Sequence, residues 1–287
     1  MDVFRAFLPQ DVCDSIDLLY GDVAPDSMNI SKAAGNASNH LSRWTSWKLD
    51  PAKVHELTHT ETKGQEALER AIKAFQDKHK EPLKTTFYAC GKRGILYEGT
   101  SASQSPVLIK VQKLNQHNSI NRESYWLRRL NRFRLGPTLV AAGPGFFICQ
   151  FFTNGLNAVE FLSHPDTTQV DVTWFLRRIL HQCFVLDVLG INKAEMTHPM
   201  RHIIVHGSSC SFVDFEKCVY GAQPRNVTQL CQFLSSPRVV AALSAKGHHL
   251  NVSQVREMAK KYKQTPGGQA FQALLDCISH RNPHQAS

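Results

Sequence analysis

The sequence predicts an α+β fold in which an antiparallel sheet precedes a helical region. Two patterns support this. Between residues 85 and 152, short apolar runs alternate with glycine-containing turns, which is typical of antiparallel strands. From residue 161 onward, apolar residues recur at helical spacing, most strongly between Trp174 and Leu189. The chain has 287 residues, 42% hydrophobic and 20% charged, which is enough apolar material for a sizeable core.

Residues 1–83 are expected to form an N-terminal extension made of a loop and a helix. Residues 24–39 are rich in Ser, Asn, Ala and Gly, and this composition indicates a loop. Trp44 and Trp47 are expected to dock this arm on a core rather than to enclose a ligand. Residues 54–80 carry an apolar stripe at helical spacing, which predicts a helix packed on the following domain.

Residues 84–152 are expected to form an N-terminal lobe of five strands and one helix. Three strands between Thr85 and Lys113 are separated by a glycine turn and a polar turn. A helix is predicted at 121–134, because Leu127 and Leu130 lie on one apolar face and a Gly-Pro pair follows. Two short apolar strands complete the sheet, at 139–142 and 146–152.

Residues 153–280 are expected to form a helical C-terminal lobe, followed by a tail at 281–287. After the long apolar helix that ends before Gly190, two short strands surround a Gly-Ser-Ser turn. Four further helices are predicted, at 226–234, 237–243, 253–263 and 269–278.

Two charged residues stand out in the N-terminal lobe. Lys110 lies within the apolar strand Val107-Leu108-Ile109-Lys110-Val111, where a charge is costly unless it is paired. Glu123 lies in the first half of the next helix, close enough for a strand-turn-helix unit to bring it to the ammonium. The alternatives are a lysine on an edge strand that reaches solvent and a glutamate on a solvated helix face.

The segment Ser211-Phe212-Val213-Asp214-Phe215-Glu216 places an aspartate at the end of a predicted strand. A strand fixes the backbone, and a carboxylate at its open end offers a hard oxygen ligand of the kind that Mg²⁺ prefers. Asp-Phe is a common dipeptide, so this segment gains meaning only from the upstream lysine, glutamate and glycine turn.

In that order, these segments resemble the protein-kinase-like superfamily. The segments GKRGILYEG, VLIKV, RESYWLRRLN with LGPTLVAAG, and VDFE are similar to those of atypical small kinases: the RIO-type, Bud32-type and lipopolysaccharide-core kinases and archaeal predicted Ser/Thr kinases. The resemblance covers residues 84–235. It implies a bilobal fold with a five-stranded N-terminal lobe and a reduced helical C-terminal lobe.

The resemblance also implies roles for individual residues, with ATP and Mg²⁺ as cofactors. Lys110 matches the lysine that holds the α- and β-phosphates, and Glu123 matches the glutamate that orients it. Asp214 matches the metal-binding aspartate of D-F-G, with Glu216 in place of the glycine. The remaining matches are Gly91 and Gly94, in a phosphate-covering loop that departs from G-x-G-x-x-G, and Cys149, at the start of a hinge (149–152) that contacts the adenine.

The catalytic loop departs from the family pattern H-R-D-x-x-x-x-N. The segment between Gly190 and Ile204 has no H-R-D, and Glu195 is its only acid. Glu195 is therefore the candidate base or hydroxyl-orienting group, with a solvated loop acid as the alternative. His202 stands where the asparagine is expected; it could contact a phosphate or Glu195, or simply pack before the strand.

These matches predict an ATP-dependent phosphotransferase, an atypical kinase that acts on a protein or a small molecule. The alternative is a pseudokinase that serves as a nucleotide-binding or interaction module, because the H-R-D and the asparagine are missing. No A-P-E motif follows Asp214, and the segment up to Asn226 is short, so a large peptide-docking platform is not expected.

Composition adds broader expectations about partners and location. The formal charge of +9 suits anionic partners such as nucleotides, and RNA is a further candidate with weaker support. The eight cysteines form no CxxC pair and are expected to be reduced. The sequence has neither a long apolar span nor a secretory signal pattern, so an intracellular protein, cytoplasmic or nuclear, is expected.

Overall fold

The computed structural model describes residues 62–91, 93–113, 119–196 and 199–279. The expected arm with Trp44 and Trp47, the beginning of the predicted helix 54–80, and the tail lie outside these ranges. The chain divides into two compact units. The sheet unit comprises the described residues up to Asn154 together with Val213–Glu216, and the helical unit comprises the other described residues from Gly155 onward.

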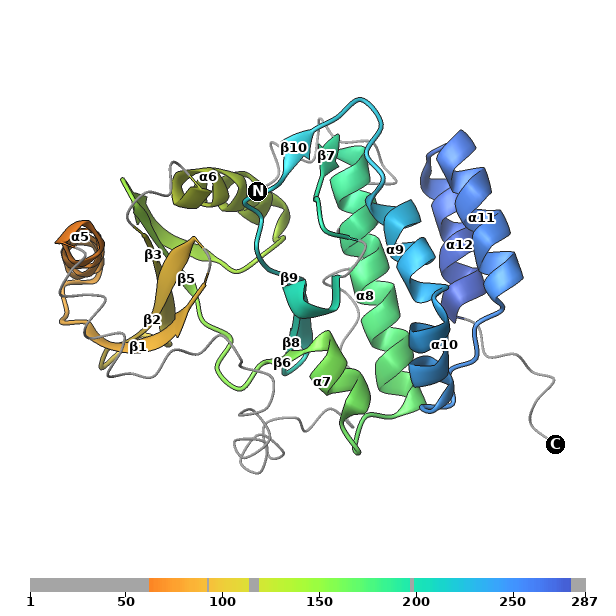
Figure 1. Cartoon of the computed structure of the whole chain (residues 1–287), viewed down its shortest axis with the longest axis horizontal. Coiled ribbons are helices and arrows are strands. Elements are labelled where there is room, and N and C mark those ends of the chain that lie inside the picture. Colours follow the sequence, from red (N-terminus) through yellow and green to blue (C-terminus); the bar gives the residue numbers. More distant parts are fainter. Residues whose placement is uncertain (1–61, 92, 114–118, 197–198, 280–287) are drawn as a thin grey trace. The chain divides into compact units, whose positions relative to one another are not determined.

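The sheet unit contains five antiparallel strands in the order β1-β2-β3-β5-β4 (Figure 1). The strands are β1 (Lys84–Cys90), β2 (Gly94–Thr100), β3 (Val107–Gln112), β4 (Leu139–Gly143) and β5 (Phe146–Gln150). Each lies close to a strand that the sequence predicts. The predicted α+β class, with a five-stranded antiparallel sheet and a helical lobe, is confirmed.

One face of this sheet packs against helix α5 (Thr62–His79). Ala71 and Phe75 of α5 share a buried core with Ile109 of β3 and Ile148 of β5. Because side chains alternate along a strand, residue 110 must point away from α5 when residue 109 points toward it. Helix α6 (Ser119–Leu130) contacts β3, β4 and β5.

The connection from α6 to β4 is held by one amide side chain. Asn131, the first residue of the short 3₁₀ helix η2 (Asn131–Phe133), donates to the carbonyl oxygens of Leu135 and Pro137. Its own side-chain oxygen accepts from the Leu139 N–H at 2.6 Å. These bonds give partners to backbone groups of the turn that are not paired with other backbone groups. They hold the residues on both sides of Gly136 and so fix its conformation.

The helical unit is built around α8 (Gln169–Val188), which is buried on nearly every side (Figure 1). Its first turn carries a capping box in which Thr168 and Asp171 bond to each other's backbone N–H. The other helices of this unit are α7 (Ala158–Ser163), α9 (Asn226–Leu234), α10 (Pro237–Ser244), α11 (Val252–Gln264) and α12 (Gly268–Ser279).

Short strands and one 3₁₀ helix complete the helical unit. A three-stranded sheet is formed by β6 (Leu156–Asn157), β8 (Ile203–His206) and β9 (Ser209–Phe212). A two-stranded sheet is formed by β7 (Ile191–Asn192) and β10 (Val219–Tyr220). The 3₁₀ helix η3 (Pro199–His202) directly precedes β8. In the part of the chain described here, every helix is too short or too polar to cross a bilayer.

A buried histidine links two helices of this unit, α8 and α12. His248 is 3% exposed, and its Nε2 donates to the Ile278 carbonyl oxygen at 2.9 Å. Its Nδ1 lies 3.3 Å from the hydroxyl of Thr173. Burial lowers the pKa of His248 from its ordinary value of 6.5. At pH values near and below 6.5, the unfolded chain therefore binds a proton on His248 more readily than the folded protein does.

We predict that the protein loses stability as the pH falls from 7 through about 6.5 and below, because folding then requires His248 to release a proton. His248→Gln should flatten this slope, measured as Tm against pH. The adjacent exposed residue gives the matched control, so His249→Gln should keep most of the slope. Equal slopes in wild type and His248→Gln would contradict the assignment.

Candidate functional site

Lys110 on β3 and Glu123 on α6 form an ion pair. Lys110 Nζ lies 2.5 Å from Glu123 Oε2, and the two side chains are 17% and 6% exposed. Lys110 is on β3, which lies between β2 and β5, so the alternative of an edge-strand lysine is wrong. The alternative of a solvated Glu123 is also wrong, because the residue is buried.

The charges around Lys110 favour its protonated form. Burial by itself lowers the pKa of Lys110, but the carboxylates of Glu123 and Asp214 outweigh this and raise it above its ordinary value. The ammonium group is therefore a permanent positive charge at neutral pH. A paired buried ammonium of this kind can offer its remaining donors to an anion.

Asp214 lies just beyond the end of β9, in a strained backbone conformation. Its φ is +63°, in the left-handed region that is unfavourable for residues other than glycine. The strand ends at Phe212, one residue earlier than predicted. Such strain persists only where the surrounding structure enforces it, and it is often found at functional sites.

Phe215 holds the segment after Asp214 in place. It is 1% exposed. A Cβ placed on Gly136 would lie 2.7 Å from its ring and 3.0 Å from Leu127 Cδ2. Gly136 itself has a φ of +76°. A glycine at this position therefore allows both the left-handed turn and the close approach of the Phe215 ring.

Three carboxylates of the sheet unit form a cluster. One oxygen each of Glu123, Asp214 and Glu216 lies within 4.8 Å of the others. Glu216 also forms an ion pair with Arg93 from the turn between β1 and β2. Carboxylate oxygens are the ligands that Mg²⁺ prefers, so the donor set fits a divalent cation. The sequence analysis did not foresee the contact of Arg93 with Glu216.

The two glycines of the β1–β2 turn have different surroundings. A Cβ on Gly94 would lie 2.8 Å from the Val111 carbonyl oxygen and 3.1 Å from Ile120 Cδ1, so sheet packing alone accounts for that glycine. A Cβ on Gly91 would meet only the Gly94 carbonyl oxygen, at 3.5 Å, which is ordinary contact. Their role at a phosphate remains a prediction.

Cys149 lies in β5, between β3 and β4, so its backbone belongs to the sheet on both sides. It pairs with Leu108, which is two residues from Lys110 and therefore on the same face. Burial, aided by the nearby Glu123 carboxylate, raises the pKa of the Cys149 thiol well above its ordinary value. Cys149 can thus contribute a neutral, apolar wall beside Lys110, while its role toward a nucleotide remains a prediction.

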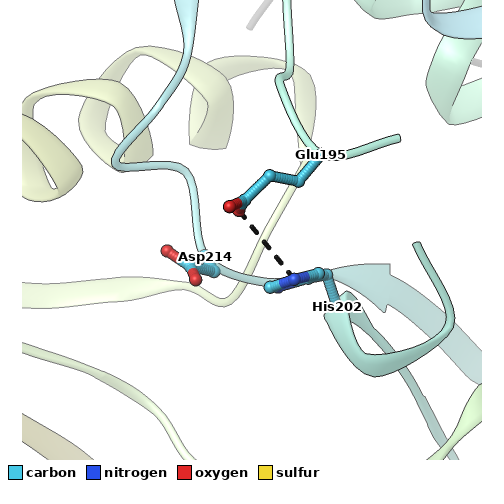
Figure 2. A group of neighbouring side chains, drawn as sticks. All are labelled: Glu195, His202 and Asp214. Atoms are coloured by element: carbon cyan, nitrogen blue, oxygen red, sulfur yellow. Dashed lines mark ion pairs between the residues drawn. The ribbon is translucent and has the colours of Figure 1, made fainter. Parts of the chain in front are cut away.

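The helical unit holds a group of charges around Glu195. Glu195 forms an ion pair with Lys217, and its Oε2 lies 3.9 Å from His202 Nε2. Figure 2 marks this contact between the Glu195 carboxylate and the His202 ring with a dashed line; the third labelled residue, Asp214, belongs to the sheet unit. Glu195 has a φ of +73°, a second strained acid. The sequence offered a contact with Glu195 as one of three alternatives for His202, and it gave no signal for Lys217.

A buried amide fixes the start of the segment that carries Glu195. Asn226, the first residue of α9, is fully buried. Its side chain accepts from the Lys193 N–H at 2.8 Å and donates to the Ile191 carbonyl oxygen at 2.7 Å. It also donates to Asp187 at 2.7 Å. Burial raises the pKa of Asp187, although the hydrogen bonds from Asn226 act to lower it. Asn226 was not singled out from the sequence, because its partners lie on other elements.

Comparisons with known proteins find neighbours among solved structures but none by sequence. No family model matches the chain, and no curated protein matches it. Among solved structures, the Rio2 kinase from Chaetomium thermophilum, described as an ADP/Mg²⁺-phosphoaspartate complex, has a TM-score of 0.42 at 14% identity. The match covers 68% of this chain and 75% of that chain.

We predict that Gly136→Ala destabilises the protein by about 2–4 kcal/mol, since it adds left-handed strain and a clash with Phe215. Gly207 gives the matched control: it also has a positive φ, but a Cβ placed on it would have nothing within 4 Å. Gly207→Ala should cost only about 1–2 kcal/mol. Urea unfolding measures both, and equal losses would show that Phe215 does not pack as described.

We further predict that Asn226→Asp costs at least about 2 kcal/mol at pH 7, because it removes two donated hydrogen bonds and puts a carboxylate beside Asp187. Asn251, which caps α11 by accepting from the Gln254 N–H, is the control. Asn251→Asp should be nearly neutral because aspartate caps as well as asparagine. A nearly neutral Asn226→Asp in the same urea titration would contradict the role of Asn226.

Proposed function

We propose that the protein is an ATP-dependent phosphotransferase of the protein-kinase-like type. The observation that supports this best is the buried pair of Lys110 and Glu123 with the strained Asp214 beside it. Burying a lysine is unfavourable unless its charge is used or compensated, and a purely structural core has no need of it. A paired ammonium next to an acidic cluster suits the binding of a metal-chelated polyphosphate.

The sheet unit supplies the nucleotide half of the proposed reaction. Mg²⁺-ATP, when bound, supplies the phosphoryl group. Lys110 donates its free N–H groups to phosphate oxygens, while Glu123 keeps the ammonium in one position. Asp214 offers its carboxylate to the metal ion. Phosphoryl transfer needs mostly positioning and charge neutralisation, and these residues provide both.

The helical unit supplies the acceptor half. Glu195 orients the attacking hydroxyl and accepts its proton, in the role that aspartate has in the family. Lys217, paired with Glu195, adds a positive charge that stabilises the transferred group. His202 limits the positions open to the Glu195 carboxylate. The acceptor is a hydroxyl group on a small molecule, or on a protein that is not bound as an extended peptide. The short segment 215–225 leaves little room for a platform that docks such a peptide.

A second candidate is a pseudokinase that binds a nucleotide or a partner without transfer. One observation favours it: the acids are already paired within the protein, Glu216 with Arg93 and Glu195 with Lys217. Internal pairing of this kind stabilises a fold without any ligand. The two candidates differ in whether Glu195 matters for turnover.

The test combines nucleotide binding with transfer from γ-labelled ATP. We predict that Mg²⁺-ATP stabilises the wild type in thermal unfolding and that Lys110→Met and Asp214→Asn each weaken binding at least about tenfold, a loss of about 1.4 kcal/mol. Glu195→Gln should keep binding but lose transfer to the protein itself or to a generic acceptor. Lys84→Ala, an exposed lysine on β1, is the control for charge.

Each outcome separates the candidates. Binding with transfer that depends on Glu195 supports the phosphotransferase. Binding that needs Asp214, with equally low transfer in wild type and Glu195→Gln, supports the pseudokinase. Folded wild-type protein that binds no nucleotide would rule out the phosphotransferase and would leave only a pseudokinase that binds a partner.

A further inference from the structure

The turn between β1 and β2 presents one arginine to the acidic cluster. Arg93 forms an ion pair with Glu216, and the two side chains are 30% and 10% exposed. The backbone of the turn is held by the Gly91 N–H, which donates to Gly94 at 2.9 Å, and by the Lys113 N–H, which donates to Arg93 at 3.4 Å. The long Arg93 side chain can therefore change partners while these backbone bonds stay in place.

We propose that Arg93 is a phosphate-binding residue that Glu216 holds in reserve. In the ligand-free protein Arg93 pairs with Glu216, and on nucleotide binding it transfers to the terminal phosphates. This inference rests on the proposed nucleotide site. It assigns Arg93 and Glu216 roles that the Lys110, Glu123 and Asp214 set does not include.

Charge balance supports an exchange rather than a fixed pair. The cluster holds three carboxylates, Glu123, Asp214 and Glu216, against two cations, Lys110 and Arg93. A polyphosphate brings more negative charge to this cluster. When Arg93 turns to the phosphates, Glu216 is left with a carboxylate that a divalent cation can take up. The metal ion then balances the acids while the arginine balances the phosphates.

The chemistry of the groups favours the same exchange. A guanidinium presents five N–H donors in a planar fork that matches phosphate oxygens, and it stays charged at any relevant pH. Phosphate carries more charge than a single carboxylate and can accept two of these donors at once. Arg93 is also partly exposed, so moving it requires less loss of packing than moving the buried Lys110.

A fixed structural pair makes a different prediction. If Arg93 only anchors the segment that contains Asp214 and Phe215, breaking the pair from either side should change nucleotide affinity in the same direction. If Glu216 restrains Arg93, substitutions of the two residues have opposite effects. Removing the Glu216 carboxylate strengthens the binding of metal-free nucleotide, and removing the Arg93 guanidinium weakens it.

The experiment measures ATP affinity by calorimetry, in EDTA and again in Mg²⁺, for wild type, Glu216→Gln, Arg93→Gln and the double variant. In EDTA we expect Glu216→Gln to bind ATP about tenfold more tightly and Arg93→Gln about tenfold more weakly, the size of one charge-assisted hydrogen bond. In EDTA the double variant should match Arg93→Gln, because without a metal ion Glu216 acts only through Arg93. In Mg²⁺ the gain of Glu216→Gln should shrink, since the metal loses a ligand.

Controls separate this inference from the function on which it rests. Arg128→Gln removes one exposed positive charge from α6 and should leave affinity nearly unchanged. Thermal unfolding checks that each variant is folded. If Arg93→Gln and Glu216→Gln change affinity in the same direction while Asp214→Asn still weakens Mg²⁺-ATP binding, the inference is overturned and the proposed function stands. Absence of nucleotide binding by folded wild type would overturn both.

Discussion

The buried ion pair between Lys110 and Glu123 is the interaction on which the site depends. A lysine in the middle of an apolar sheet is tolerable only if a carboxylate compensates its charge. Helix α6 provides that carboxylate because it follows β3 and contacts the sheet. The pair therefore links the position of the helix to the electrostatics of the strand, and it fixes an ammonium group beside Asp214 that stays charged.

The rest of the sheet unit protects this arrangement. Helix α5 covers the face of the sheet opposite to Lys110. The neighbouring apolar residues Ile109 and Val111 therefore pack in a core with α5. Gly136 leaves room for the Phe215 ring, which in turn fixes the backbone of the neighbouring Asp214. In the helical unit, Asn226 performs a comparable task for the segment that leads to Glu195. Both candidate acids, Asp214 and Glu195, thus lie in strained backbone that nearby packing or hydrogen bonding supports.

Much of the fold could be predicted from sequence because its elements carry local patterns. Strand alternation and helical spacing located the five strands and the main helices, and the short distance along the chain between Lys110 and Glu123 made their pairing foreseeable. The pairs Arg93 with Glu216 and Glu195 with Lys217 join segments that only the tertiary structure brings together. Two-residue strands such as β7 and β10 contain too few residues to show a period. The clash that requires glycine at position 94 comes from a β3 carbonyl group, which no local pattern reveals.

The central claim is that Lys110 stands beside bound phosphates. An acyl-phosphate derivative of ATP tests this directly, because it transfers its acyl group to an amine next to the phosphates, and mass spectrometry identifies the modified lysine. The account predicts that Lys110 is acylated and that Mg²⁺-ATP in excess prevents the labelling. Acylation confined to exposed lysines such as Lys84, with no competition by ATP, would contradict it.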